Sequence, residues 1–215
     1  MSDRNPAIGW DAHGRSAGGT AAVGIVETVV KLGGGVLADA EHFEAALAAI
    51  GGAAQVRRLL VVPGGGPFAN AVREVDRRLR LSDDAAHWMA VLAMDQYAHL
   101  LAARLAGGVL VAEPREIAAA LSAGHVPVLA PSRWLRAVDP LPHAWMVTSD
   151  SIAAWVAGAV GARRLVLIKP SGAAGRELVD AYFARALPAH VTPVIVPADQ
   201  VDALHSALRG EVEHL

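Results

Sequence analysis

The feature that most constrains the fold of this chain is a repeated alternation of short apolar runs with segments of helical periodicity. The runs are rich in Val, Leu and Ile and occupy residues 26–32, 59–62, 109–112, 126–129, 163–169 and 192–197. Uninterrupted apolar runs of this kind are typical of parallel strands that are buried on both faces. We therefore predict an α/β fold, a three-layer αβα sandwich with a mostly parallel central sheet.

The segments between the runs predict the helices of this sandwich. Helical spacing of Ala and Leu, with capping residues at the starts, indicates helices at residues 42–50, 67–79, 82–105, 115–122, 148–162, 177–187 and 200–209. We expect the first of these helices to stop at Gly51 and Gly52. Residues 131–143 contain several prolines and are predicted to form a loop.

Length and composition limit the possible classes of protein. A chain of 215 residues suits one large domain, which we place at residues 21–215 after a flexible N-terminal segment of residues 1–20. The sequence shows neither a signal peptide nor a convincing membrane span, so we expect a cytoplasmic protein without a membrane partner. A net charge of −2 offers no broad basic surface, which argues against a nucleic-acid partner. Cysteine is absent, and the nine histidines show no ligand spacing, so we expect no protein-bound metal.

Two strands are predicted to run directly into glycine clusters, in "VVKLGGG" at residues 29–35 and "LLVVPGGG" at residues 59–66. Right-handed crossovers place the carboxyl ends of parallel strands on one edge of the sheet, which is where ligands bind. Glycine clusters there allow backbone N–H groups to turn toward an oxyanion. A tight strand-to-helix turn is the structural alternative. Neither cluster has the Walker A or the GxGxxG spacing, so a P-loop enzyme and a Rossmann dehydrogenase are both disfavoured.

Lys31 and Lys169 are the only lysines in the chain, and each ends a predicted apolar strand on this edge. Lysine usually lies on exposed surfaces, so two strand-end lysines beside glycine clusters are unusual. They indicate local cationic groups next to a site for anions.

Several segments, in the order in which they occur, resemble the amino acid kinase superfamily. They are "VVKLGGGVL", "LLVVPGGGPFANAV" and "TSDSIAAWVAGAVGARRLVLIK", followed by the closing helix, strand and helix. The resemblance implies that superfamily's carbamate kinase-like fold, phosphoryl transfer from ATP with Mg²⁺ carried by the nucleotide, and assembly as a homo-oligomer. More narrowly, "SDDAAHWMAVLAMDQYAHLLA" and "WMVTSDSIAAW" resemble the short branch of [5-(aminomethyl)furan-3-yl]methyl phosphate kinases of methanofuran biosynthesis, which implies a phosphomonoester acceptor.

The resemblance also implies roles for individual residues. Lys31 and Lys169 would contact the transferring phosphoryl group and the ATP phosphates, and Asp150 would hold both lysines in orientation. The N–H groups of one cluster would face the transferring phosphoryl group and those of the other would face the acceptor; these residues are Gly33, Gly34, Gly64, Gly65 and Gly66. An ordinary position in the first turn of a helix is the alternative interpretation of Asp150.

The acceptor side is expected on the two helices that follow the second glycine cluster. Arg73 is a candidate ligand for an acceptor phosphate, or else a surface arginine. On the long helix, Asp84, His87 and Asp95 share an arc with Val91, which is either a solvated face or a site for the ammonium group of the acceptor. In the second case, Trp88 or Met94 would pack on the acceptor ring.

One turn departs from the family pattern. After Lys169 many relatives have Asp-Gly within a few residues, whereas this chain has "KPSGAAGREL". Two alternatives therefore remain beside the phosphate kinase: a kinase for another phosphate or carboxylate acceptor, and a non-catalytic protein that binds nucleotide or oxyanions.

Overall fold

The computed structural model describes residues 26–172 and 178–211, so the expected flexible segment at residues 1–20 lies outside the described residues. The described strands are β1 (Thr28–Leu32), β2 (Leu59–Pro63), β3 (Gly108–Val111), β4 (Val126–Leu129), β5 (Arg164–Lys169) and β6 (Thr192–Pro197). They form one sheet in the order β3-β4-β2-β1-β5-β6, and every neighbouring pair is parallel. The predicted α/β sandwich with a parallel sheet is therefore confirmed.

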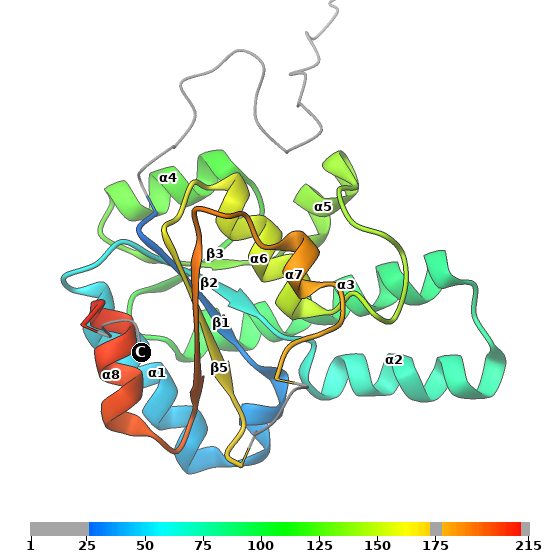
Figure 1. The fold of residues 1–215 in the computed structure, drawn as a ribbon, viewed down its shortest axis with the longest axis horizontal. Helices are drawn as coiled ribbons and strands as arrows, with labels where there is room; N and C mark the ends of the chain where they lie inside the picture. The colour runs from blue at the N-terminus through cyan, green and yellow to red at the C-terminus, as the bar shows by residue number, and fades with distance from the viewer. Residues whose placement is uncertain (1–25, 173–177, 212–215) are drawn as a thin grey trace, which may run out of the picture.

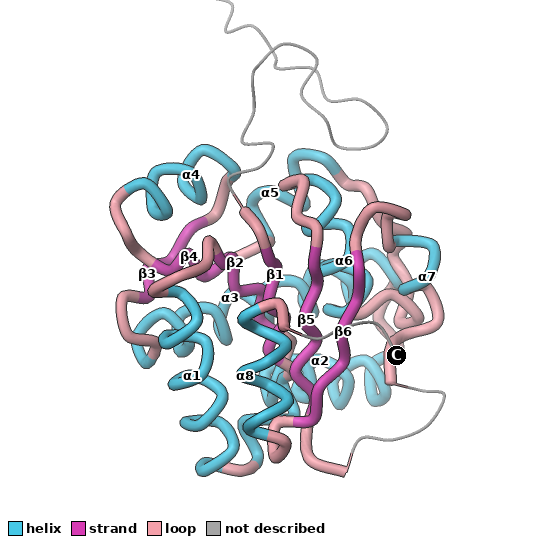
Figure 2. The backbone as a smooth tube through the Cα atoms, turned by 60° about the vertical axis from the view of Figure 1, so that its left-hand side comes forward, coloured by secondary structure: helices cyan, strands magenta, loops and turns pink. Residues whose placement is uncertain are grey.

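Helices cover both faces of this sheet (Figures 1 and 2). After the 3₁₀ helix η1 (Gly34–Ala38), the described helices are α1 (Ala40–Ala54), α2 (Gly66–Leu79), α3 (Asp83–Arg104), α4 (Pro114–Ser122), α5 (Ser132–Val138), α6 (Ser149–Ala159), α7 (Phe183–Ala186) and α8 (Val201–Arg209). Side chains of α4 to α7 share one buried cluster with the sheet, while those of α1 and α8 share another, and α3 contributes to both. No described helix is long and apolar enough to cross a membrane.

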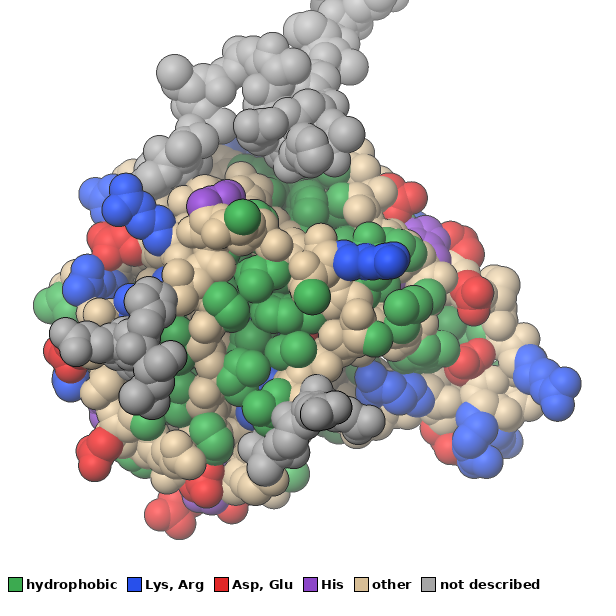
Figure 3. Space-filling view, in the orientation of Figure 1, with side chains coloured by type: hydrophobic (Ala, Val, Ile, Leu, Met, Phe, Trp, Pro, Cys, Tyr) green, Lys and Arg blue, Asp and Glu red, His purple; other side chains and the backbone are tan. Residues whose placement is uncertain are grey.

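Helix α2 extends away from the sheet and packs along α3. Its last turn carries Arg77 and Arg78, and basic side chains project at this outer end of the molecule (Figure 3). Only Ala69 and Val72 of α2 are buried. The wall that α2 provides is therefore attached to the rest of the protein mainly through α3.

The first helix does not stop where the sequence predicts. Helix α1 continues through Gly51 and Gly52 to Ala54. Gly51 is buried, but a Cβ at this position would meet Leu105 and Ala106 only at ordinary van der Waals distance, so packing does not require a glycine here. Tertiary packing has outweighed the weak helix propensity of glycine, which disfavours the interior of a helix by only about 1 kcal/mol relative to Ala.

The predicted loop at residues 131–143 contains helix α5. The loop prediction is wrong because this helix is stabilised by contacts with residues that are distant in the sequence. The carboxylate of Asp95 accepts hydrogen bonds from the backbone N–H and the hydroxyl of Ser132, while Trp134 and Leu135 are buried. Pro131 lies immediately before the helix, where its missing N–H costs nothing.

The helix predicted at residues 177–187 is much shorter than expected. Helix α7 covers only Phe183–Ala186, and residues 178–182 form bends and turns. The N–H of Tyr182 donates to Asp180 Oδ1 at 3.0 Å, a local bond that competes with helical hydrogen bonding. The remaining bonds of this carboxylate go to the start of α6, as described below.

Candidate active site

Two parallel strands place both lysines of the chain at the same edge of the sheet. Strand β1 pairs with β5 so that Lys31 lies opposite Leu167, and Lys169 follows Leu167 on the same face because side chains alternate along a strand. Helix α6 packs on this face and carries Asp150 in its first turn. The register of the sheet therefore brings these three ionisable side chains together.

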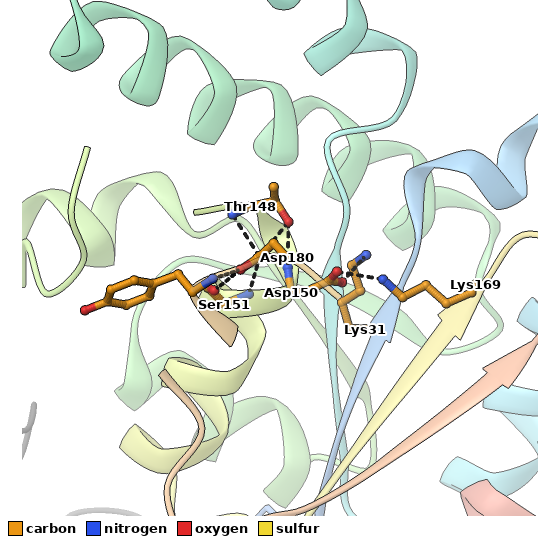
Figure 4. A network of polar contacts seen from close by, with 7 residues as sticks. Lys31, Thr148, Asp150, Ser151, Lys169 and Asp180 are labelled. Atoms are coloured by element: carbon orange, nitrogen blue, oxygen red, sulfur yellow. Dashed lines mark hydrogen bonds and ion pairs between the residues drawn. The ribbon is translucent and has the colours of Figure 1, made fainter. Parts of the chain in front are cut away.

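Asp150 lies between the two lysines and contacts both of them (Figure 4). Its Oδ1 is 2.8 Å from Lys31 Nζ, and its Oδ2 accepts a hydrogen bond from Lys169 Nζ at 2.6 Å. The contact with Lys31 is an ion pair without hydrogen-bond geometry, so Oδ1 of Asp150 has no hydrogen-bond donor among the described residues. The exposed fractions are 4% for Lys31, 5% for Asp150 and 9% for Lys169. A buried cluster with two cations and one directly contacting anion is suited to receive a further negative group.

Burial and charge oppose each other in setting the ionisation of this cluster. Burial lowers the pKa of Lys31 below its ordinary value, and the charge of Lys169 acts in the same direction, while Asp150 opposes both. Burial raises the pKa of Asp150, but the two lysines outweigh that effect and hold it below its ordinary value. Asp150 is therefore a stable carboxylate, and the ammonium of Lys31 loses its proton more readily than that of an ordinary lysine.

The two glycine clusters touch each other backbone to backbone. A Cβ on Gly34 would lie 2.1 Å from the N of Gly66, and a Cβ on Gly64 would lie 2.5 Å from the N of Gly34. Only glycine permits this approach, which explains why both strands end in glycine. Gly66 also has a φ of 56°, a left-handed conformation that a residue with a side chain rarely adopts.

Not all of the predicted glycine donors are free. The N–H of Gly33 donates to Ile168 O at 2.9 Å, and that of Gly64 donates to Leu32 O at 2.8 Å, which extends the sheet. These two N–H groups are not available to a phosphate, which corrects the expectation for Gly33 and Gly64. Among the described residues, no acceptor takes the N–H groups of Gly34, Gly65 and Gly66. These three remain candidate donors.

A cavity of about 280 Å³ opens beside this junction, between the glycine clusters, α2, α3 and the start of α6. Its polar wall includes Arg73, Asp83 and His87, and its apolar wall includes Met94 and Trp145. Val91, Thr148, Ser149 and Ile152 complete the part nearest α6. Such a mixture suits a small ring that carries charged groups.

Arg73 is held at the rim of this cavity by its neighbours. Its guanidinium lies 5.2 Å from the ring centroid of Trp145, and its Nη1 donates to Asn70 Oδ1 at 3.0 Å. The indole N–H of Trp145 donates in turn to Asp76 Oδ2 at 2.7 Å. Within residues 26–172 and 178–211, no carboxylate forms an ion pair with Arg73. The guanidinium therefore keeps donors for an acidic ligand.

Of the three side chains predicted on α3, only His87 lines the cavity. Asp84 lies outside it and contacts His143 Nδ1 at 2.7 Å, while Asp139 contacts Nε2 of the same ring at 2.9 Å. The ring of His143 stacks on His87 with centroids 4.1 Å apart. Asp84 thus fixes a loop against the cavity wall.

Asp95 is also placed away from the cavity, because its carboxylate binds Ser132 at the start of α5. Of the two side chains considered for packing on the acceptor ring, Met94 lines the cavity and Trp88 does not. Trp88 packs instead against His87, His143 and Arg136.

Sequence reasoning missed four residues of this region, namely Asp83, Trp145, Thr148 and Asp180. Asp83 and Thr148 stand at the starts of predicted helices, where capping alone explains such residues. Trp145 opens the segment "WMVTSDSIAAW", but nothing in that segment indicates that its ring lines a cavity. Asp180 lies in a segment with helical periodicity, so nothing nearby in the sequence marks it as a partner of α6.

Comparison with known proteins gives one family match and several similar chains. The model of the amino acid kinase family matches residues 27–173. A [5-(aminomethyl)furan-3-yl]methyl phosphate kinase from Methanocaldococcus jannaschii is 30% identical over 142 residues, which cover 65% of this chain and 63% of that protein. The match thus spans less than two thirds of that relative.

Two solved structures share the fold. The uridylate kinase from Archaeoglobus fulgidus superposes with a TM-score of 0.64 at 17% identity and covers 86% of this chain and 96% of its own. The UMP kinase from Ureaplasma parvum gives 0.63 at 14% identity, with 85% and 96% coverage. At these identities the likeness establishes the arrangement of the elements.

Proposed function

We propose that this chain, which belongs to the amino acid kinase family, transfers the γ-phosphoryl group of ATP to a phosphomonoester. The observation that carries the proposal is the pair of buried lysines held by one carboxylate at the contact of two glycine clusters. Phosphoryl transfer needs positioning and compensation of spread negative charge more than it needs a nucleophile from the protein. The cluster supplies fixed cations for that charge.

In this proposal each group of the cluster has a distinct task. Lys31, whose ammonium lies beside the glycine junction, would contact the transferring phosphoryl group, and Lys169 would contact the ATP phosphates. Asp150 would orient both ammonium groups. The free N–H groups of Gly34, Gly65 and Gly66 would bind phosphate oxygens on either side of the transferring group.

The described residues fit Mg²⁺ only as a companion of the nucleotide. Among them, no group of three or more His, Asp or Glu side chains gathers into a metal site. Asp150, the carboxylate nearest the junction, is already engaged by two lysines. Mg²⁺ in kinase sites is bound largely by substrate phosphates, whose charge it partly neutralises.

For the acceptor we propose [5-(aminomethyl)furan-3-yl]methyl phosphate, which would become the diphosphate. The 30% identity to the M. jannaschii kinase supports this choice, and the cavity chemistry agrees with it. Arg73 would bind the acceptor phosphate, Met94 and Trp145 would pack on the furan ring, and Asp83 would face the ammonium group. Homo-oligomerisation and a cytoplasmic location stay predictions.

The test is ADP release from Mg-ATP with and without this acceptor, with the product mass measured. We expect acceptor-dependent ADP and the mass of the diphosphate. The Lys169→Met variant should lose turnover, whereas Arg115→Met, which changes an arginine with a 75% exposed side chain, should not. Turnover with a different acceptor would mean that only the substrate is wrong. ATP binding without any turnover would instead support the non-catalytic alternative.

A further inference from the structure

The side chain of Asp180 gathers five hydrogen bonds although it lies outside the lysine cluster. Its Oδ2 accepts from Thr148 N at 3.0 Å, Thr148 Oγ1 at 2.7 Å and Ser151 N at 3.0 Å. Its Oδ1 accepts from the hydroxyl of Ser151 and from Tyr182 N at 3.0 Å. Figure 4 shows this carboxylate beside the Lys31, Asp150 and Lys169 cluster. One acidic group thus accepts from two backbone N–H groups and two hydroxyls at the start of α6, where N–H groups have no partner within the helix.

These bonds surround the residue that orients the lysines. Thr148 and Ser151 lie on either side of Asp150 in the chain, and the N–H of Asp150 itself donates to Thr148 Oγ1 at 3.4 Å. Ser151 is fully buried, so the first turn of α6 is fixed by packing as well as by these hydrogen bonds. Asp180 follows β5 in the chain and therefore ties the segment after Lys169 to the helix that carries Asp150.

We propose that Asp180 is a positioning residue for phosphoryl transfer, which fixes the first turn of α6 so that Asp150 holds both lysine ammonium groups in a working geometry. The inference rests on the proposed kinase function but concerns a residue outside the substrate-contacting set. Small displacements of catalytic groups are costly because rate depends steeply on their alignment. Asp180 acts through Asp150 and touches neither lysine.

The side chain at position 180 has to be a charged carboxylate, and an uncharged amide of the same shape cannot replace it. Each of its oxygens accepts from a backbone N–H, Oδ2 from Thr148 and Ser151 and Oδ1 from Tyr182. In Asp180→Asn, either orientation of the amide would point an NH₂ group at an N–H donor. The negative charge also favours the start of a helix and opposes the effect of burial on Lys31, whose pKa it raises. Three ionisable groups influence the pKa of Lys31: Asp150 and Asp180 raise it, and Lys169 lowers it.

A simple helix cap is the competing explanation, and a matched variant separates the two. Asp39 accepts from His42 N at 3.0 Å at the start of α1 and contacts no residue of the lysine cluster. Asp39→Ala removes a cap without touching α6, so it should lower the melting temperature and leave kcat within about twofold of wild type. Asp180→Asn should lower kcat about 100-fold while the KM for ATP changes less than about threefold.

A spectroscopic readout makes the test independent of turnover. Because the chain has only two lysines, ¹⁵N-lysine labelling gives two side-chain signals, which Lys169→Met assigns. We expect the Lys31 signal to titrate at lower pH in Asp180→Asn than in wild type, and to be unchanged in Asp39→Ala. If wild type shows no kinase activity, the proposed function fails, and this titration still decides whether Asp180 acts on the lysine cluster.

Two results would overturn the inference: an Asp180→Asn variant with kcat within twofold of wild type, or lysine titrations identical to wild type. If Asp180→Asn does not fold, Ser151→Ala removes a single donor to Asp180 and replaces the test. That variant should lower kcat about fivefold to tenfold, and an unchanged kcat would equally reject the positioning role.

Discussion

The lysine cluster and the cavity beside it are two halves of one candidate site, but they are built in different ways. The cluster comes from strand ends and one helix start, and its three charged residues are at most 9% exposed. The cavity is enclosed by α2, α3 and the loop before α6, with Arg73 and Asp83 at the protein surface. The rigid sheet fixes the chemistry, whereas packing between peripheral elements shapes the wall that selects an acceptor. Substitutions in the two halves should therefore have different kinetic signatures.

Loss of the central carboxylate should have the largest effect. In Asp150→Asn, two buried ammonium groups lose their shared partner, which should lower the free energy of unfolding by about 3–5 kcal/mol and kcat by about 10³-fold. Because the pKa of Asp150 is held below its ordinary 3.8, its contribution to stability is present above that pH and is lost as pH falls through the lowered value.

Steady-state kinetics and urea unfolding would measure both effects, with Asp202→Asn as a control on the exposed first turn of α8. An Asp150→Asn variant with near-normal kcat would show that the cluster is only structural.

The contact between the glycine clusters predicts a steric effect of intermediate size. In Gly34→Ala the new Cβ would lie 2.1 Å from the N of Gly66, so the loops must separate at a cost of about 1–3 kcal/mol. Gly52→Ala is the matched control, because a Cβ there meets nothing within 4 Å and should raise stability by about 1 kcal/mol. Thermal unfolding of the two variants should shift in opposite directions, and equal shifts would contradict the packing explanation.

The cavity half predicts an effect on acceptor affinity alone. Arg73→Gln should raise the KM for the acceptor about 10- to 100-fold, the value of one charged hydrogen-bonded contact, with kcat and the KM for ATP little changed. Arg77→Gln, on the same helix but bound to Glu74, provides the control. A fall in kcat at unchanged acceptor KM would show that Arg73 acts in the chemical step, with the lysine cluster, and not in acceptor binding.

The same contrast explains how much of the molecule could be predicted from its sequence. Lys31, Lys169 and Asp150 each stand at the end of a strand or the start of a helix, and a parallel sheet brings such positions to one edge. The cavity depends on contacts between distant segments. Asp95 lies on α3 and accepts hydrogen bonds at the start of α5. Asp180 lies in a segment with helical periodicity, but it is not helical and accepts hydrogen bonds at the start of α6. No local pattern indicates bonds of this kind, so the sequence groups His87 with Asp84 and Asp95 in one arc of α3, although only His87 lines the cavity.

The smallest effect concerns His143, whose ring stacks on the cavity-lining ring of His87. Partial burial disfavours the charged ring of His143, but hydrogen bonds to Asp139 and Asp84 outweigh it and raise its pKa above the ordinary 6.5. The stacked ring of His87 is affected in the opposite direction, since burial and the charge of His143 lower its pKa to about 4. Between about pH 4 and the raised pKa of His143, the pair is therefore one imidazolium held by two carboxylates against one neutral ring.

The sign of the pH effect follows from these two shifts. The stabilising contribution of His143 is complete below pH 6.5 and is lost as pH rises through its raised pKa, whereas that of neutral His87 weakens as pH falls from 6.5 toward 4. Because the carboxylates of Asp84 and Asp139 are partly exposed, their contacts with His143 contribute about 0.2–1 kcal/mol. We therefore expect the acceptor KM to rise about two- to fivefold above the His143 pKa. His143→Asn should abolish this alkaline rise while Lys31, Asp150 and Lys169 keep kcat nearly constant. If the rise persists in that variant, the pH response originates in the lysine cluster, and the two halves of the site are less independent than their construction suggests.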